Sequence, residues 1–319
     1  MTTPTASEVL AGIDLIGKLA IVTGGSSGVG LETTRALAAA GAAVVVPARD
    51  VASARAALAN VAGVTVQAMD LGDLASIRSF AGIVVAGGRQ VDILINNAGI
   101  MATPETRVGK GWESQFAINH LGHFALTNAL WPVLGAGSRV VAVASGVSRI
   151  RWEDPQFEHG YDKWEAYGQS KTANRLFALQ LDALGAPTGI RAFSAVPGYI
   201  LTPLQRHLTR DEMVAAGWVD ESGAAVGDIF ITPAQGAATS VFAATSPSLD
   251  GIGGMHTALA QLDGPIEAGF DSLSPQEVRA EAQRLWDYSA ELVGAPPPGA
   301  APLKEFGDRD HSRSPNMFD

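Results

Sequence analysis

The sequence predicts an α/β protein built on one doubly wound parallel sheet, with helices layered on both faces and about seven strands. Short β-branched apolar runs alternate with helix-length amphipathic segments, which is the pattern of a parallel sheet covered on both sides. The chain of 319 residues is also 47% hydrophobic, so it can bury one large core. A three-layer α/β/α domain with a single sheet accounts for both observations.

The elements follow one another in a single series without an internal repeat. Strands are expected near residues 19–22, 43–46, 65–68, 92–95, 139–144, 191–196 and 255–258. Helices are expected near residues 29–40, 52–60, 74–85, 112–134, 164–184 and 233–244. These elements define one domain over residues 15–294, preceded by an N-terminal extension at residues 1–14.

Three segments depart from this alternation. Residues 146–166 form an aromatic and acidic insertion, and residues 201–231 form a polar, helix-prone stretch between a strand and the next helix. Both are expected to be loops that wall a substrate cleft. Residues 295–319 are rich in Pro and Gly, so we expect a loosely held C-terminal tail there.

Composition argues against several classes of function. The net charge of −10 and the absence of any Lys/Arg run disfavour nucleic-acid binding. Zero cysteines exclude disulfides, thiolate metal ligands and cysteine nucleophiles, and the acidic group around His159 fits a solvated loop better than a metal site. No apolar run approaches the ~20 residues of a membrane span, and the first residues do not resemble a signal peptide. We therefore expect a cytoplasmic protein with no membrane anchor and no bound metal.

The glycine-rich stretch TGGSSGVG at residues 23–30 lies between the first strand and the first helix. In a doubly wound sheet this turn directs free backbone N–H groups at the ligand crevice, and the helix N-terminus adds partial positive charge. Glycines let the backbone approach a pyrophosphate closely. A plain strand-to-helix turn is the alternative, which the position after the first strand disfavours. The residues expected to contact the ligand are Gly24, Ser26, Ser27, Gly28, Val29 and Gly30.

Four motifs in the correct order give the chain a resemblance to a known family. The glycine spacing Thr-Gly-x-x-x-Gly-x-Gly is followed by NNAG after the fourth predicted strand, YGQSK in the helix predicted over residues 164–184 and PG after the sixth strand. This combination resembles the short-chain dehydrogenase/reductase family over about residues 15–292. The resemblance implies a Rossmann fold, a nicotinamide cofactor and an oxidoreductase activity.

Tyr167 and Lys171 match the family's Tyr-x-x-x-Lys pair and also make chemical sense. Four residues apart on a helix, they project from the same face. A phenol titrates near pH ~10 in water, and a nearby ammonium or an oxidised nicotinamide would favour the phenolate and lower that pKa. Such a tyrosine can exchange a proton with a carbonyl or alcohol oxygen. The alternative is an ordinary surface pair.

The resemblance implies two further catalytic residues. Ser145 follows the fifth predicted strand and matches the serine that orients the substrate, although Ala144 replaces the first serine of the family's usual pair; Ser148 is the second choice. Asn119 matches the helix asparagine that holds a water in a proton relay. The neighbouring histidines, 120 and 123, are interpreted as helix-packing residues rather than catalysts.

Cofactor choice depends on the residue after the second strand. An acidic side chain there would bind the ribose hydroxyls of NAD, whereas this chain has Ala48 followed by Arg49. A guanidinium suits the extra phosphate of NADP, so NADP is favoured over NAD. Arg49 could instead pair with Asp50 or lie at the surface. By resemblance, the remaining cofactor contacts come from Asp70, Leu71, Asn97, Ala98, Gly99, Tyr167, Lys171, Pro197, Gly198, Ile200 and Thr202.

The sequence around and between the motifs most resembles the retinol-dehydrogenase and WW-domain-oxidoreductase branch of the family. This branch implies a small apolar alcohol, aldehyde or ketone as substrate. Reduction of a C=C bond, or NADP sensing without turnover, are the alternatives. Family members often pair through their fifth and sixth helices, of which the fifth is the helix that carries Asn119, so the resemblance also implies a homodimer or homotetramer. The cleft walls are expected to carry aromatic and apolar residues that either contact substrate or pack the loops, namely Trp152, Phe157, Tyr161, Trp164, Leu204, His207, Met213 and Trp218.

Overall fold

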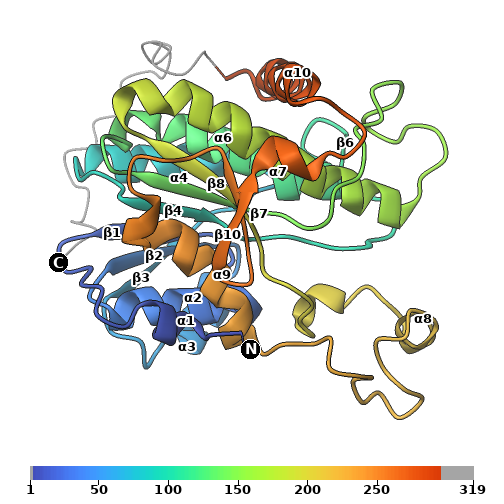
Figure 1. Cartoon of the computed structure of the whole chain (residues 1–319), viewed down its shortest axis with the longest axis horizontal. Helices are drawn as coiled ribbons and strands as arrows, with labels where there is room; N and C mark the ends of the chain where they lie inside the picture. The colour runs from blue at the N-terminus through green and yellow to red at the C-terminus, as the bar shows by residue number, and fades with distance from the viewer. Residues whose placement is uncertain (1–2, 296–319) are drawn as a thin grey trace.

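The computed structural model describes residues 3–295 and contains one central eight-stranded sheet (Figure 1). Across the sheet the strand order is β10-β9-β8-β7-β4-β1-β2-β3, and every neighbouring pair is parallel except β9 and β10. The strands are β1 (Leu19–Val22), β2 (Ala43–Ala48), β3 (Val64–Ala68), β4 (Ile93–Asn96), β7 (Arg139–Val143), β8 (Arg191–Val196), β9 (Met255–Ala258) and β10 (Gln261–Pro265).

The strand order reverses beside β1, which pairs with β2 on one side and with β4 on the other. At such a switch point the connections leave the sheet in opposite directions and open a crevice at the carboxyl ends of the strands. The central strands are buried on both faces, as their continuous apolar sequences require. The fold therefore prepares a ligand site next to the glycine-rich turn.

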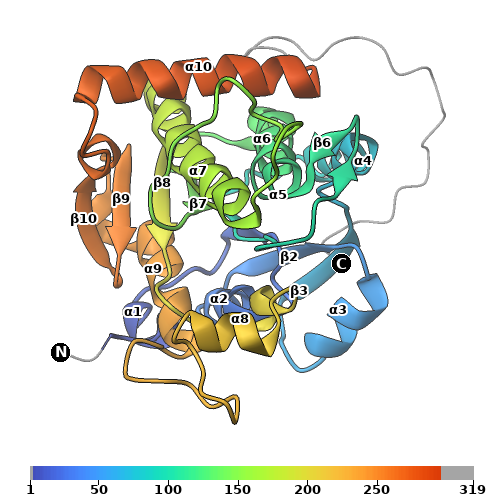
Figure 2. The same cartoon turned by 90° about the vertical axis from the view of Figure 1, so that its right-hand side faces the viewer.

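Helices cover both faces of the sheet, which gives the three predicted layers (Figures 1 and 2). One layer contains α1 (Ala6–Val9), α2 (Gly28–Ala39), α3 (Val51–Ala57) and α9 (Pro233–Thr245). The other contains α4 (Leu74–Ala86), α6 (Gly122–Ala129), α7 (Lys163–Gly185) and α10 (Pro275–Val293). Among the helices between Thr3 and Ala295, none combines the length and apolar character that a bilayer crossing requires.

All seven predicted strands are present, and the predicted fold class is confirmed. The eighth strand, β10, was not predicted, and it runs antiparallel to β9 with an irregular register between Leu262 and Gly264. It is short, largely exposed and ends in Gly264-Pro265, so it lacks the buried β-branched pattern of the other strands. The sheet is therefore mostly rather than wholly parallel.

The helix predicted over residues 112–134 is present over residues 114–129, but its two ends and its middle differ from one regular α-helix. The first two residues of the segment form β6 (Trp112–Glu113), which pairs with the preceding β5 (Arg107–Val108) in a hairpin. Glu113 then caps α5 (Ser114–Phe116) by accepting the N–H groups of Gln115 and Phe116. A π-helical turn over residues 117–121 follows, then α6 and a 3₁₀ turn over 131–133. Two glycines before Trp112 allow the hairpin.

Helix α10 was not predicted, although its sequence carries clear end signals. Ser274 and Glu277 form a capping box at its start, and Gly294 ends it with φ +64°. Its inner face packs across α6 and α7, where Trp286 stacks on Phe177 with ring centroids 5.8 Å apart. Helix α10 therefore covers the two helices through which the family often pairs.

The remaining predicted segments are partly structured. In the N-terminal extension, α1 buries Ala6 and Leu10 in the layer that contains α2 and α9. The loop 201–231 contains a short 3₁₀ turn over Pro203–Gln205 and the helix α8 (Arg210–Ala215). Apart from Ala295, the predicted tail lies outside the described residues.

Candidate active site

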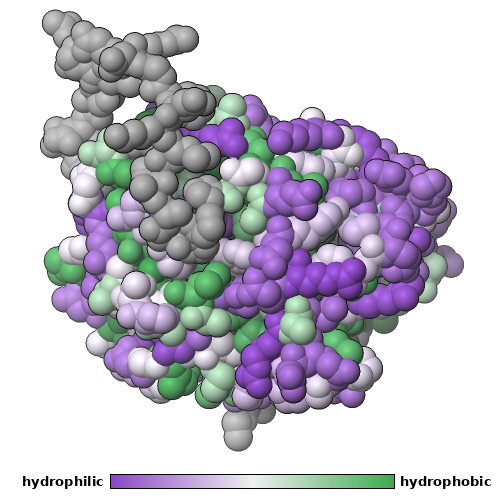
Figure 3. Space-filling model, turned by 90° about the horizontal axis from the view of Figure 1, so that it is seen from above, coloured by the Kyte–Doolittle hydropathy of each residue, from purple (hydrophilic) through white to green (hydrophobic). Residues whose placement is uncertain are grey.

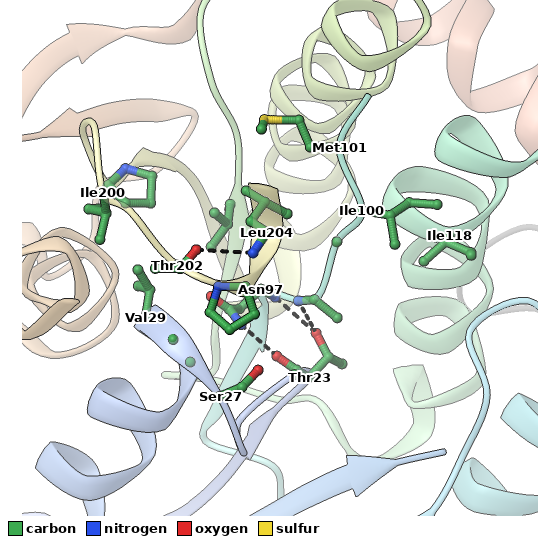
Figure 4. Close-up of a pocket in the computed structure, with 18 of the residues that line it drawn as sticks. Thr23, Ser27, Val29, Asn97, Ile100, Met101, Ile118, Ile200, Thr202 and Leu204 are labelled. Atoms are coloured by element: carbon green, nitrogen blue, oxygen red, sulfur yellow. Dashed lines mark hydrogen bonds between the residues drawn. The ribbon is translucent and has the colours of Figure 1, made fainter. Parts of the chain in front are cut away.

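A cavity of about 800 Å³ opens at the carboxyl ends of the parallel strands (Figure 4). It is lined by the glycine-rich turn, the ends of β2 and β4, the segment after β7, the start of α7 and the loop after β8. All residues predicted to contact the cofactor line this one cavity, namely Gly24, Ser26, Ser27, Gly28, Val29, Gly30, Arg49, Asp70, Leu71, Asn97, Ala98, Gly99, Tyr167, Lys171, Pro197, Gly198, Ile200 and Thr202.

The glycine-rich turn has a shape that side chains would disrupt. Gly24 has φ +64°, and a Cβ there would lie 3.0 Å from Cα of Ala98. A Cβ at Gly30 would collide with the carbonyl oxygen of Gly24. Ser27 is the N-cap of α2, yet its hydroxyl makes no capping hydrogen bond, so the first N–H groups of the helix remain directed at the cavity. These residues fit a dinucleotide pyrophosphate.

Thr23 has no role in the sequence-based prediction, yet it connects the segment after β1 to the segment after β4. Its hydroxyl oxygen accepts the backbone N–H groups of Asn97 and Ala98, each at 2.9 Å. The same oxygen lies 2.8 Å from Nε2 of His123, and Nδ1 of that histidine lies 2.9 Å from the carbonyl oxygen of Asn119. Figure 4 shows the bonds between Thr23 and Asn97 at the base of the cavity. The link spans 100 residues, so no local sequence pattern could reveal it.

Arg49 lies exposed at the cavity wall, directly after β2. The pairing with Asp50 that the sequence left open is not formed, because Asp50 caps α3 by accepting the N–H of Ser53. Among the ion pairs of residues 3–295, none includes Arg49. The guanidinium is therefore available to an anionic ligand.

Tyr167 and Ser145 meet at the wall of the cavity. The Ser145 hydroxyl beside the Tyr167 phenol lowers the pKa of that phenol, but burial has the larger effect and raises the pKa to about 12. The predicted lowering of this pKa by Lys171 is thus not produced by the protein's own groups. Ser148, the second choice for the catalytic serine, does not line the cavity.

Lys171 is almost fully buried beneath the tyrosine. Its Nζ donates to the carbonyl oxygen of Val143 at 3.1 Å and lies 5.9 Å from the centre of the Tyr167 ring. Burial lowers the pKa of the Lys171 ammonium to about 8. A shared helix face therefore brings the two side chains together, as the spacing predicts, while the ammonium is directed at a backbone carbonyl.

Asn119 lies behind the cavity wall, on the π-helical turn, and does not line the cavity. Its side chain accepts the N–H of Ile100 at 2.8 Å and donates to the carbonyl of Ile100 and to the Ser170 hydroxyl, both at 2.9 Å. The amide thus ties the segment after β4 to the helix that carries Tyr167. π-Helical turns are frequent at functional sites because they re-aim backbone and side-chain groups.

The aromatic residues of the insertion divide into two groups. Trp164 lines the cavity and packs edge-on against Trp218 of the loop 201–231, with ring centroids 6.0 Å apart. Trp152 packs on α10 instead, while Phe157 is buried, and Tyr161 hydrogen-bonds to Gln115. Packing therefore accounts for most of these aromatics. The cavity's other apolar walls come from residues that include Met101, Tyr199, Leu204 and Phe230.

Comparison with known proteins agrees with this geometry. The family model described as short chain dehydrogenase matches residues 18–213. A Streptomyces lividans protein named "Probable oxidoreductase" is 44% identical over 301 residues, which span 89% of this chain and 100% of that protein. Retinol dehydrogenase 11 of Mus musculus is 35% identical over 296 residues, which span 89% of each chain.

Solved structures give the same picture. An uncharacterised protein from Mycobacterium paratuberculosis superposes with a TM-score of 0.71 at 33% identity, covering 92% of this chain and 98% of that one. A short chain dehydrogenase from Burkholderia cenocepacia, solved in complex with NADP, gives a TM-score of 0.61 at 25% identity, covering 79% and 98%. The chain is an oxidoreductase of the short-chain dehydrogenase/reductase family and falls in its retinol-dehydrogenase-like branch.

Proposed function

We propose that this protein interconverts an alcohol and a carbonyl group on a small lipophilic substrate, with NADP(H) as hydride carrier and Tyr167 as acid and base. The observation that carries the proposal is the Tyr167 phenol beside the Ser145 hydroxyl in the cavity that the glycine-rich turn lines. A proton donor and a pyrophosphate cradle in one cavity are the two parts that such a reaction requires.

The protein's own residues would divide the work as follows. With a pKa near 12, the Tyr167 phenol holds its proton at neutral pH and can donate it to a carbonyl oxygen. Ser145 orients that oxygen by a hydrogen bond. Asn119 keeps the wall after β4 and helix α7 in register through Ile100 and Ser170. When bound, the nicotinamide supplies or accepts the hydride and, in its oxidised form, adds a positive charge that favours the phenolate.

Two features support the choice of cofactor and substrate. The Arg49 guanidinium has no carboxylate partner among the described residues, which favours the extra phosphate of NADP over the ribose hydroxyls of NAD. The catalytic end of the cavity is walled by Met101, Trp164, Leu204 and Trp218. Apolar and aromatic walls with a few polar groups suit a lipophilic alcohol, aldehyde or ketone.

The experiment is the loss of NADPH absorbance, with NADH in parallel, against a panel of apolar aldehydes and ketones. We expect turnover with NADPH, and a roughly 10²–10⁴-fold lower kcat in Tyr167→Phe, because general acid–base catalysis contributes that much. The affinity for NADPH, measured by its fluorescence, should remain close to that of the wild type.

Tyr288→Phe is the matched control, because this phenol bonds to Gln156 beneath α10 and does not line the cavity. It should retain wild-type kcat. Activity that survives in Tyr167→Phe would reject the assigned proton donor. Activity only on conjugated C=C bonds would favour double-bond reduction, and NADPH binding without any turnover across the panel would favour a sensor.

A further inference from the structure

We propose that Arg206, in the loop after β8, is a second binding residue for the 2′-phosphate of NADP and acts together with Arg49, which lines the same cavity. This inference rests on the proposed use of NADP and assigns a role to a residue that no motif singles out. Its consequence is that the cofactor's extra phosphate holds the loop that also walls the substrate end of the cavity.

The first support is position. Arg49 follows β2 and Arg206 follows the 3₁₀ turn Pro203–Gln205, yet both side chains line the same cavity. The loop lies directly over the glycine-rich turn, because a Cβ at Gly28 would be 3.4 Å from Cβ of Thr202. Figure 4 shows Thr202 and Leu204 of this loop facing the side of the cavity that carries Ser27 and Val29. Arg206 lines the same cavity two residues after Leu204.

The second support is charge. The two guanidiniums are close enough that the positive charge of Arg49 adds to burial in lowering the pKa of Arg206. Arg206 donates from Nη1 to the carbonyl of Pro203 at 3.0 Å, and no ion pair within residues 3–295 includes it. Two like charges held together beside a cavity repel each other, and an anion between them relieves that repulsion.

Neither acidic residue of the cavity forms an ion pair with these arginines. The carboxylate of Asp50 is directed to the N–H of Ser53, and that of Asp70 to the N–H of Gly72. A phosphate monoester carries close to two negative charges at neutral pH and offers three acceptor oxygens. Two guanidinium groups, each with several N–H donors in a planar fork, are well matched to such a group.

The position of Arg206 also links cofactor choice to the substrate site. Leu204, two residues earlier, packs with Tyr167 and Met101 in the apolar cluster at the catalytic end. An ion pair at Arg206 therefore restrains the same short turn that presents Leu204. NADP should order this wall more than NAD does.

The test measures the affinities of NADP and NAD by calorimetry at low ionic strength, using the full chain and the variants R49Q, R206Q, R206K and R210Q. Arg210 is the matched control, because it is an exposed arginine of the same loop that bonds to the carbonyl of Glu221 and does not line the cavity. Arg206 is exposed, so its replacement should not affect folding, and thermal unfolding of each variant verifies this.

We expect R206Q to weaken NADP binding by roughly ten- to hundredfold, since hydrogen bonds to charged groups contribute that much, and to leave NAD binding unchanged. R206K should lose less, and R210Q nothing. As an independent readout, NADP should slow amide hydrogen exchange over residues 203–216 more than NAD does in the wild type, and this difference should disappear in R206Q.

Other outcomes overturn the inference in distinguishable ways. If R49Q loses NADP affinity while R206Q does not, Arg49 alone binds the 2′-phosphate. The inference about Arg206 is then wrong, while the proposed function stands. If R206Q weakens NADP and NAD equally, Arg206 binds the pyrophosphate. If the wild type binds NAD as tightly as NADP, the proposed cofactor preference itself is wrong.

Discussion

At the scale of single residues, the hydrogen bonds around His123 determine its protonation. The Asn119 carbonyl can only accept, so Nδ1 of His123 must carry a proton. The Thr23 hydroxyl already accepts two N–H groups, so its own proton is directed to Nε2, 2.8 Å away, in preference to the Ile95 carbonyl at 3.4 Å. The imidazole is neutral, and burial lowers its pKa to about 4.

This arrangement predicts sensitivity to acid. The folded pKa of His123 lies below its ordinary value of 6.5, so between about pH 6.5 and 4 the unfolded chain binds a proton that the folded chain does not. The contribution of His123 to the free energy of unfolding therefore falls as pH falls through this window, by about 2 kcal/mol between pH 6.5 and 5. Urea unfolding at pH 7 and pH 5 measures it.

His123→Phe should be less stable at pH 7 by about 2 kcal/mol, because it leaves the Thr23 hydroxyl without its acceptor and the Asn119 carbonyl without its donor. It should also lose less stability than the wild type on going to pH 5. Gln283→Ala, at an exposed residue that does not titrate, serves as the control and should keep the wild-type slope. An unchanged slope in His123→Phe would contradict the neutral buried imidazole.

The sequence located most of the candidate site, because family motifs lie at fixed points of the alternating elements. Gly24, Tyr167 and Thr202 all line the cavity as expected. The residues that sequence reasoning missed depend on neighbours far away in the chain: Thr23 lies 2.8 Å from His123, and Arg206 lines the same cavity as Arg49. A lone arginine in a polar loop carries no periodic or motif signal, so only the folded chain reveals it.

At the scale of elements, α10 was missed because it carries none of the family motifs. The helical periodicity of its apolar residues could nevertheless have revealed it. Its inner face carries Val278, Ala282, Leu285, Trp286 and Val293 at helical spacing, and all are buried. The helix predicted over residues 112–134 is right over residues 114–129 and wrong at its ends. Helical periodicity carries no signal for the strand at residues 112–113, for the π-helical turn over 117–121 or for the 3₁₀ turn over 131–133.

Trp286→Ala tests how strongly α10 is held. The indole stacks on Phe177 and meets Phe124 edge-on at 4.7 Å, so truncation removes contacts with both α6 and α7. We expect a loss of about 3–5 kcal/mol in the free energy of unfolding, measured by urea titration. Gln283→Ala, on the exposed face of the same helix, should change it by less than about 0.5 kcal/mol. Equal effects would mean that α10 is only loosely attached.

At the scale of the whole molecule, α10 changes what the family resemblance implies about assembly. Pairing through α6 and α7 would need their outer faces, and α10 already occupies them. Seen from above in Figure 3, the surface over α10 is largely hydrophilic. The exposed side chains of that helix agree, since most of them are polar or charged and include Gln276, Glu277, Arg279, Gln283, Arg284, Asp287 and Glu291.

We therefore predict that the chain is a monomer at micromolar concentration, with a mass of 33.0 kDa by light scattering coupled to size exclusion. A stable dimer typically needs ~800 Å² of well-packed surface from each partner. To expose that area on α7, the chain would have to detach α10 and hydrate Trp286 and Leu285, at a cost of about 1.5–3 kcal/mol for each large apolar side chain. A species of twice this mass in the wild type would contradict the prediction. If Trp286→Ala dimerises while the wild type does not, α10 acts as the barrier between the monomer and the helix-to-helix pairing that the resemblance implies.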